Sequence, residues 1–180
     1  MIDRVLIPRD RLAARTAELG AALTLDLRSA GADAEGQRIV MVPILTGAML
    51  FVADLVRHMP VQMAIRPITV SSYPGTATSS QGASIRGELP TDLAGAHVIL
   101  VDDILDSGRT LGLLSRVLLA QNPASLRLAV LLDKHKPGGR DEQVKVDYVG
   151  FQIEDAFVVG YGLDYDGYYR NLPDICVLRA

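Results

Sequence analysis

Three aspartates follow a short apolar run, and their types and spacing indicate a site for a polyol. The run Val98–Val101 ends in the adjacent acids Asp102 and Asp103, and Asp106 follows two more apolar residues. A carboxylate accepts two hydroxyl hydrogen bonds, so such acids suit a diol or a metal-bound polyol. Neighbouring strand residues point in opposite directions, so we expect Asp102 and Asp103 to do different jobs. The alternative is that these acids only cap a turn.

The next four residues have the composition of a phosphate-binding turn. Ser107, Gly108, Arg109 and Thr110 supply two hydroxyls, a glycine and successive backbone N–H groups where a helical pattern begins. Such donors at a helix N-terminus, with the positive end of its dipole, bind phosphate. The alternative is that Ser107 or Thr110 simply caps the helix. Acids beside a phosphate-binding turn predict a sugar phosphate, most simply a ribose 5-phosphate.

The elements that must position these residues follow from the apolar pattern. Leu12, Leu19, Leu23 and Leu27 recur at helical spacing, whereas short apolar runs are typical of buried strands. Alternating strands and helices predict an α/β fold with a mainly parallel twisted sheet flanked by helices, and its ligand at the carboxyl ends of strands. The expected helices are 9–30, 48–59 and 110–121, and the expected strands are 38–45, 61–70, 97–101, 125–132, 148–153, 157–159 and 175–178.

The segment of about 71–88 interrupts this pattern. It is rich in serine, glycine and threonine and has no apolar periodicity. Loops of this length in a compact domain are commonly lids. We therefore expect a flexible lid loop beside the site.

Composition limits the class of protein. The 180 residues predict a single domain, 1–180, and the single cysteine, Cys176, excludes an internal disulfide. With 18 Lys plus Arg against 21 Asp plus Glu, the net charge of −3 argues against a nucleic-acid partner. No apolar run approaches the roughly 20 residues of a membrane span, and the charged N-terminus lacks a signal sequence, so we expect a cytoplasmic protein without a membrane partner.

The string from Val98 to Thr110 resembles the 5-phosphoribosyl 1-pyrophosphate (PRPP) motif of type I phosphoribosyltransferases. Over about residues 38–178, the chain is similar to the hypoxanthine-guanine phosphoribosyltransferase family. This resemblance is carried by three further segments, which are Leu45–Ala48, Ser71–Tyr73 and Phe157–Tyr165. It implies the type I phosphoribosyltransferase fold, with a small hood built from the N- and C-terminal segments. It also implies a homodimer or homotetramer.

The resemblance implies how PRPP would be bound. Asp102 and Asp103 would hold the ribose hydroxyls directly or through Mg²⁺, the implied cofactor, although the family usually has Glu-Asp at this pair. Residues 106–110 (Asp106, Ser107, Gly108, Arg109 and Thr110) would surround the 5-phosphate. The pyrophosphate and lid residues would be Thr46, Gly47, Ser72, Tyr73 and Arg170.

One departure affects the pyrophosphate loop. Thr46 stands where the family commonly has a basic residue. We expect the main-chain N–H groups of Thr46, Gly47 and Ala48 to bind the pyrophosphate instead.

The resemblance also implies how the purine would be bound. Asp106 would be the catalytic acid/base at purine N7, and Lys134 would donate to the 6-oxo group. Phe157 would stack on the base, Val158 would offer main-chain groups to its edge, and Asp164 would help to frame it. The implied metal-binding residues are Asp102, Asp103 and Asp164.

The function implied is purine salvage. The enzyme would transfer the 5-phosphoribosyl group from PRPP to hypoxanthine or guanine, giving IMP or GMP and pyrophosphate. One alternative is a xanthine-preferring enzyme, and another is a non-catalytic PRPP-sensing regulator. The net charge of −3 and the presence of Asp106 count against the regulator.

Overall fold

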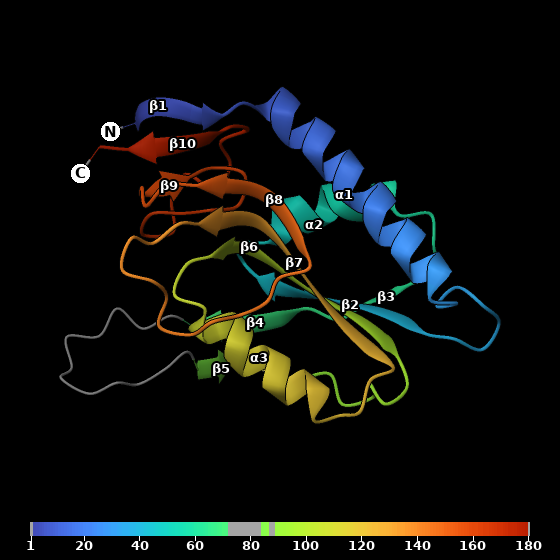
Figure 1. Ribbon diagram of the computed structural model, residues 1–180. Coiled ribbons are helices and arrows are strands. Elements are labelled where there is room, and N and C mark those ends of the chain that lie inside the picture. Colours follow the sequence, from blue (N-terminus) through green and yellow to red (C-terminus); the bar gives the residue numbers. More distant parts are fainter. Residues whose placement is uncertain (1, 72–83, 87–88, 180) are drawn as a thin grey trace.

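A seven-stranded sheet forms the centre of the protein in a computed structural model, which describes residues 2–71, 84–86 and 89–179 (Figure 1). The strand order is β5-β4-β2-β6-β7-β8, and β3 also pairs with β2. Every pair in this sheet is parallel except β4 with β5. The expected mainly parallel α/β sheet is confirmed.

The bounds of the elements are as follows. The sheet contains β2 (Ile39–Leu45), β3 (Ala64–Ile65), β4 (Ile68–Ser71), β5 (Ser84–Arg86), β6 (His97–Leu105), β7 (Ser125–Lys134) and β8 (Tyr148–Ile153). The helices are α1 (Arg9–Ser29), α2 (Met49–Leu55) with the 3-10 turn η1 (Val56–His58), and α3 (Arg109–Leu119). None of the helices in the described part of the chain is long and apolar enough to span a membrane.

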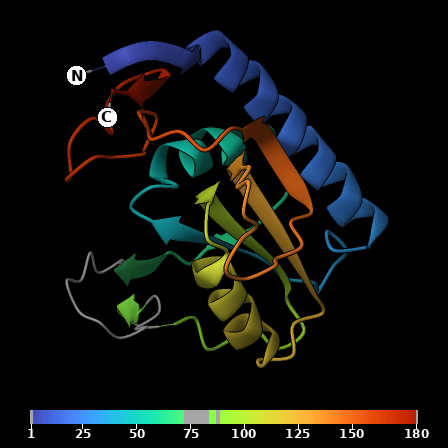
Figure 2. The same ribbon diagram turned by 60° about the vertical axis from the view of Figure 1, so that its left-hand side comes forward.

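The central strand β6 is buried on both faces. Ile99 and Val101 belong to the core that packs under α1 and α2, whereas Val98 and Leu100 belong to the core under α3. Figure 2 shows α1 and α3 on opposite sides of the sheet. A strand covered on both faces must be apolar at every position, which is why β6 begins as an uninterrupted apolar run.

A second, three-stranded sheet joins the two ends of the chain (Figure 1). In this small sheet, β10 (Ile175–Leu178) lies between β1 (Ile2–Ile7) and β9 (Val158–Val159), and both pairings are antiparallel. The backbone N–H of Arg9 donates to Asp174 Oδ1 at 2.8 Å and fixes the junction with α1. Strand β1 was not expected, because only Ile7 of its residues is buried and charged residues interrupt its apolar pattern.

Two other expected elements differ from the structure. The expected strand 61–70 is the two short strands β3 and β4, separated by Arg66 and Pro67, because proline has no N–H to donate to a ladder. Strand β5 lies within the segment expected as a loop, 71–88.

Two strands continue further than expected, and this changes where the site residues lie. Strand β6 runs through Leu105, so Asp102 and Asp103 are strand residues rather than turn residues. Strand β7 runs to Lys134, two residues beyond the expected strand 125–132. The parallel pairing of β6 with β7 extends as far as Leu105 opposite Asp133, and it therefore fixes both sets of residues in one frame.

The core under α1 can be tested with two leucines of the same helix. Leu23 is fully buried, whereas Leu25 is 69% exposed. We expect Leu23→Ala to lower the free energy of unfolding by about 2–5 kcal/mol, because it leaves a cavity in the core. Leu25→Ala should change it by less than about 0.5 kcal/mol. Urea denaturation of both variants measures this difference, and equal losses would contradict the packing described.

Candidate active site

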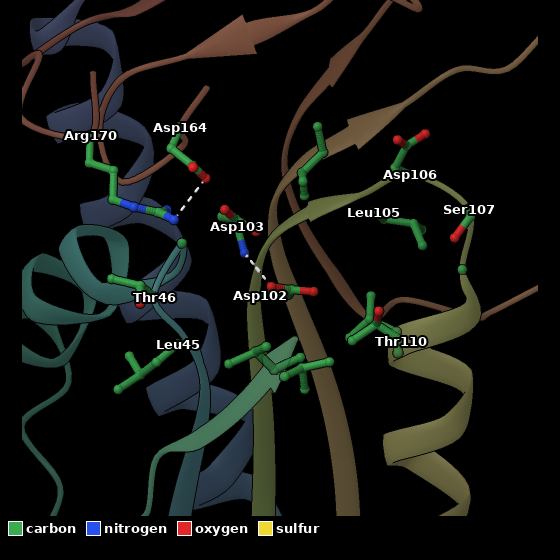
Figure 3. A pocket seen from close by; sticks show the side chains of 16 residues that line it. Leu45, Thr46, Asp102, Asp103, Leu105, Asp106, Ser107, Thr110, Asp164 and Arg170 are labelled. Carbon is green, nitrogen blue, oxygen red and sulfur yellow. Dashed lines mark hydrogen bonds and ion pairs between the residues drawn. The ribbon is translucent and has the colours of Figure 1, made fainter. Parts of the chain in front are cut away.

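A cavity of about 350 Å³ lies at the carboxyl ends of β2 and β6, beside the N-terminus of α3 (Figure 3). This is the edge at which parallel sheets bind ligands. The predicted site residues that line it are Thr46, Gly47, Asp102, Asp103, Asp106, Ser107, Gly108, Thr110, Asp164 and Arg170. The fold thus brings together residues from three separate segments of the sequence.

Asp102 and Asp103 form the floor of the cavity. Asp102 is 7% exposed, and one of its oxygens, Oδ1, accepts a hydrogen bond from the N–H of Asp103 at 3.0 Å. Their side chains point to different sides of β6, with that of Asp103 toward Asp164 and Arg170 (Figure 3). The alternation expected for neighbouring strand residues is therefore present, although both side chains reach the same cavity.

Burial sets the charge state of this pair. Desolvation raises the pKa of Asp102 well above the ordinary carboxyl range, and the neighbouring charge of Asp103 raises it further. Desolvation also raises the pKa of Asp103, against the opposing effects of a hydrogen bond with Asp102 and the charge of Arg170. A cation or several hydroxyl donors at this place would relieve the cost of burying two adjacent carboxylates.

Two glycines allow the surrounding loops to approach Asp103. A side chain at Gly47 would overlap the Asp103 carboxylate. Gly162 has a φ of +105°, and a side chain there would overlap the carbonyl oxygen of Gly47. Three chain segments therefore meet at these contacts. The peptide bond between Leu45 and Thr46 is cis.

The loop after β2 offers fewer free donors than the sequence suggested. The N–H of Ala48 donates to the carbonyl of Ile44 at 3.3 Å, so it belongs to the turn that starts α2. A pyrophosphate at Ala48 would have to replace this hydrogen bond, so the expected role of Ala48 stays a prediction. Thr46 and Gly47 remain the candidate main-chain donors.

Arg170 and Asp164 form an ion pair at the opposite wall. The guanidinium lies 2.8 Å from Asp164 Oδ1 and also donates to the carbonyl of Gly162 at 2.6 Å. The other carboxylate oxygen of Asp164 accepts from the N–H of Gly167 at 2.8 Å. Both side chains are thus held in place at the edge of the cavity, with Arg170 close enough to act electrostatically on Asp103.

The N-terminus of α3 faces the cavity without a side-chain cap. Gly108 is the N-cap residue and has a φ of +83°. The Ser107 hydroxyl lies 3.4 Å from the N–H of Arg109, at the outer limit for a hydrogen bond. Ser107 therefore caps the helix only through this one long hydrogen bond, and a ligand could accept from the other N–H groups at the start of α3. The Arg109 guanidinium does not line the cavity, because it pairs with Asp141 at 3.0 Å.

Asp106 is contacted by two lysines. Lys136 Nζ lies 2.6 Å from Asp106 Oδ1, and Lys134 Nζ lies 3.8 Å from Oδ2 and 3.3 Å from Asp155 Oδ1. Lys134 is 8% exposed, and the carboxylate of Asp106 raises the pKa of Lys136. The sequence singled out Lys134 but missed Lys136, whose only signal was its place in a charged segment just beyond β7.

Comparison with known proteins agrees with this geometry. A family model described as "Phosphoribosyl transferase domain" matches residues 14–166. The chain is 46% identical to the hypoxanthine-guanine phosphoribosyltransferase of Mycobacterium tuberculosis, over 98% of this chain and 86% of that protein. The chain belongs to the hypoxanthine-guanine phosphoribosyltransferase family. A hypoxanthine phosphoribosyltransferase of Escherichia coli is 40% identical over 95% of this chain and 92% of its own length.

Solved structures of the family have the same fold. The hypoxanthine-guanine phosphoribosyltransferase of Bacillus anthracis superposes with a TM-score of 0.86 at 35% identity, covering 99% of this chain and all of that one. The hypoxanthine phosphoribosyltransferase of Trypanosoma cruzi superposes with a TM-score of 0.89 at 36% identity, covering 99% and 92%. The expected type I phosphoribosyltransferase fold is thereby confirmed.

Not every residue singled out by the family resemblance lines the cavity. Phe157 is 53% exposed and packs edge-on against Tyr165, with ring centroids 5.5 Å apart. Val158 is buried in β9, where it pairs with Val177. Val158 thus lies in the small sheet and Phe157 directly precedes it, and neither lines the cavity. Ser72 and Tyr73 lie outside the described residues.

The contact between Gly47 and Asp103 can be tested directly. The added methyl group of Gly47→Ala would displace the Asp103 carboxylate. Because this carboxylate is the flexible end of a side chain, the fold should persist while the binding of PRPP weakens. We expect PRPP to bind at least about tenfold more weakly, since one or two hydrogen bonds to a charged group are misplaced. Titration calorimetry measures this affinity.

A matched control for this experiment is Gly138→Ala. Gly138 lies in open space, so an added side chain there meets no atom. PRPP affinity should equal that of the unaltered protein. Wild-type affinity in Gly47→Ala would show that the close approach of these residues has no role in binding.

Proposed function

We propose that the protein is a purine-salvage enzyme that transfers the 5-phosphoribosyl group of PRPP to hypoxanthine or guanine, giving IMP or GMP and pyrophosphate. The observation that carries the proposal is one cavity that contains the buried Asp102 beside Asp103, the N-terminus of α3 and Asp106. The names of the relatives, which include hypoxanthine-guanine and hypoxanthine phosphoribosyltransferases, support the choice of base.

PRPP would lie along the cavity with its phosphates at opposite ends. The 5-phosphate would accept hydrogen bonds from the main chain of residues 107–110 at the start of α3. The ribose hydroxyls would meet Asp102 and Asp103. The pyrophosphate would lie near the main chain of Thr46 and Gly47, with the charge of Arg170 nearby.

The carboxylates present fit a magnesium ion. In the part of the chain that the structure describes, His, Cys, Asp and Glu residues form no group of three or more that could enclose a metal. Mg²⁺ is commonly held by one or two carboxylates together with substrate phosphates and water. The protein therefore needs to supply only some of its ligands. Asp102 and Asp103 would hold one ion, and Asp164 would bind a second one through water. When bound, Mg²⁺ would neutralise charge on the departing pyrophosphate.

The reaction needs one proton transfer from the base. N9 of the purine would form a bond to the anomeric carbon as the bond to pyrophosphate breaks, and the N7 proton would pass to the Asp106 carboxylate. Lys134 would donate to the 6-oxo group, which disfavours the 6-amino group of adenine. Phe157 and Val158 would bind the face and edge of the base from the small sheet.

Asp106 is paired with Lys136 in the structure, so the purine must compete with this lysine. Lys136 Nζ lies 2.6 Å from the carboxylate, which is the position that N7 would need. The Lys136 side chain is 30% exposed, so it has room to move toward solvent when the base binds. Binding of the base would therefore replace one partner of Asp106 with another.

We also propose how the chain is organised and where the protein acts. We infer a single domain over 1–180, with the small sheet as the hood and the segment of about 71–88, including Ser72 and Tyr73, as a lid that excludes water from the reacting sugar. The protein would act in the cytoplasm as a homodimer or homotetramer. The net charge of −3 supports the absence of a nucleic-acid partner.

The assay that tests the function uses the purified protein with PRPP, Mg²⁺ and each base in turn. We expect nucleotide and pyrophosphate to form with hypoxanthine or guanine but not with adenine, because Lys134 offers a donor to the 6-position. Product formed from xanthine alone would change the assigned base. A failure of all three 6-oxopurines to react would overturn the assignment as an enzyme.

The role of Asp106 can be tested separately from PRPP binding. Asp106→Asn keeps the shape of the side chain but removes the proton acceptor. Turnover should fall by about 100-fold or more, while PRPP affinity stays at the wild-type value because the main chain of the phosphate-binding turn is unchanged. Turnover close to that of the unaltered enzyme would refute the acid/base role.

A further inference from the structure

The segment 140–142 packs along the outer side of the phosphate loop, which we define as residues 106–109. The N–H of Glu142 donates to the carbonyl of Ser107 at 3.1 Å. The carbonyl of Glu142 lies so close to Gly108 that any side chain there would overlap it. The segment therefore contacts the middle of the phosphate loop through its backbone.

The same segment also reaches both ends of the phosphate loop. The Asp141 carboxylate pairs with Arg109 at 3.0 Å, and both side chains are more than half exposed. Arg140 Nε donates to the carbonyl of Asp106 at 3.2 Å. The segment thus contacts each of the four residues of the phosphate loop.

Arg140 makes the contacts that go beyond this loop. Its guanidinium donates to the carbonyl of Lys134 at 2.7 Å and forms an ion pair with the Asp133 carboxylate. Its side chain is 19% exposed. One planar group therefore joins the end of β7, where Lys134 lies, to the start of the phosphate loop, where Asp106 lies.

No regular secondary structure holds this segment in place. Residues 135–147, all of which the structure describes, contain no helix or strand. Besides the contacts just described, an ion pair between Glu142 and Arg116 and the packing of Val144 against the core hold the segment. Only a guanidinium presents donors in a rigid fork that can reach two carbonyls and a carboxylate together, so a lysine could not reproduce the arrangement.

We propose that Arg140 is a positioning residue that holds the phosphate loop and the end of β7 in the geometry needed to bind PRPP. This inference rests on the proposed function, because it takes the phosphate loop as the site of the 5-phosphate. Arg140 touches neither substrate. It acts through the carbonyls of Asp106 and Lys134, which set the places of the 5-phosphate donors and of the proposed contact with the base.

The test compares PRPP and IMP, which carry the 5-phosphate, with pyrophosphate, which does not. Arg140→Met removes the donors and keeps much of the apolar stem. We expect the dissociation constant of PRPP, measured by titration calorimetry without a base, to rise roughly ten- to hundredfold, as for a loop misplaced by about 1 Å. The dissociation constant of IMP should rise in parallel, whereas that of pyrophosphate should be unchanged. Arg140→Lys should recover only part of the affinity, and it carries the same test if the methionine variant does not fold.

Arg38→Met is the matched control. Arg38 also donates to two backbone carbonyls, those of Asp92 at 2.9 Å and Ala94 at 2.8 Å, but it lies at the end of the sheet opposite the cavity. PRPP, IMP and pyrophosphate should bind to this variant as they do to the wild type. This control shows whether the effect comes from losing any arginine that binds backbone carbonyls or from losing Arg140 in particular.

The outcomes distinguish the inference from the function on which it rests. Wild-type PRPP affinity in Arg140→Met, or an equal loss of affinity for PRPP and pyrophosphate, would overturn the positioning role. Loss of PRPP and IMP affinity with pyrophosphate affinity retained would support it. If the wild type binds PRPP and yet converts no purine, the proposed reaction fails while the role of Arg140 at the phosphate loop still stands.

Discussion

The site depends on the cost of placing two adjacent carboxylates at the end of a strand that is covered on both faces. The apolar half of β6 removes water from the strand, and desolvation then raises the pKa of both Asp102 and Asp103. Among the residues that the structure describes, Arg170 is the positive group that acts on Asp103, and it is already shared with Asp164. A buried pair with so little compensation favours a ligand that brings cations or hydroxyl donors. The protein therefore compensates the charges of Asp102 and Asp103 only in part, and a bound ligand would supply the rest.

The walls of the cavity follow from the need to approach that pair closely. Gly47 has no side chain because the Asp103 carboxylate occupies the space, and Gly162 has none because the backbone of Gly47 occupies it. On the other side, Gly108 lies against the backbone of residue 142. Two of these three contacts, those at Gly162 and Gly108, are with backbone atoms, which vary less in position than side chains do. Such contacts hold binding groups within the narrow tolerances that a two-substrate reaction requires.

The sequence predicted the parts of the protein that rest on local pattern. The string from Val98 to Thr110 carries its own strand, turn and helix signals, and the topology of a parallel sheet then fixes where the cavity must be. Local pattern did not predict β1, because most of its residues are exposed and charged residues interrupt its apolar ones. It also did not predict that β7 continues to Lys134. It also failed for Lys136 and Arg140. These lie in a polar segment with no periodicity, and Arg140 meets Asp106 across 34 positions of the chain, so only tertiary packing defines the contact.

The small sheet has a consequence for the order of folding. Ile2 pairs with Leu178, and β9 can join only through β10, so the platform that carries Phe157 and Val158 closes the longest loop in the protein. Loop closure of this kind is slow and comes late, whereas the neighbouring parallel strands can assemble from segments closer together. A nascent chain would therefore complete its phosphate end before its base-binding end.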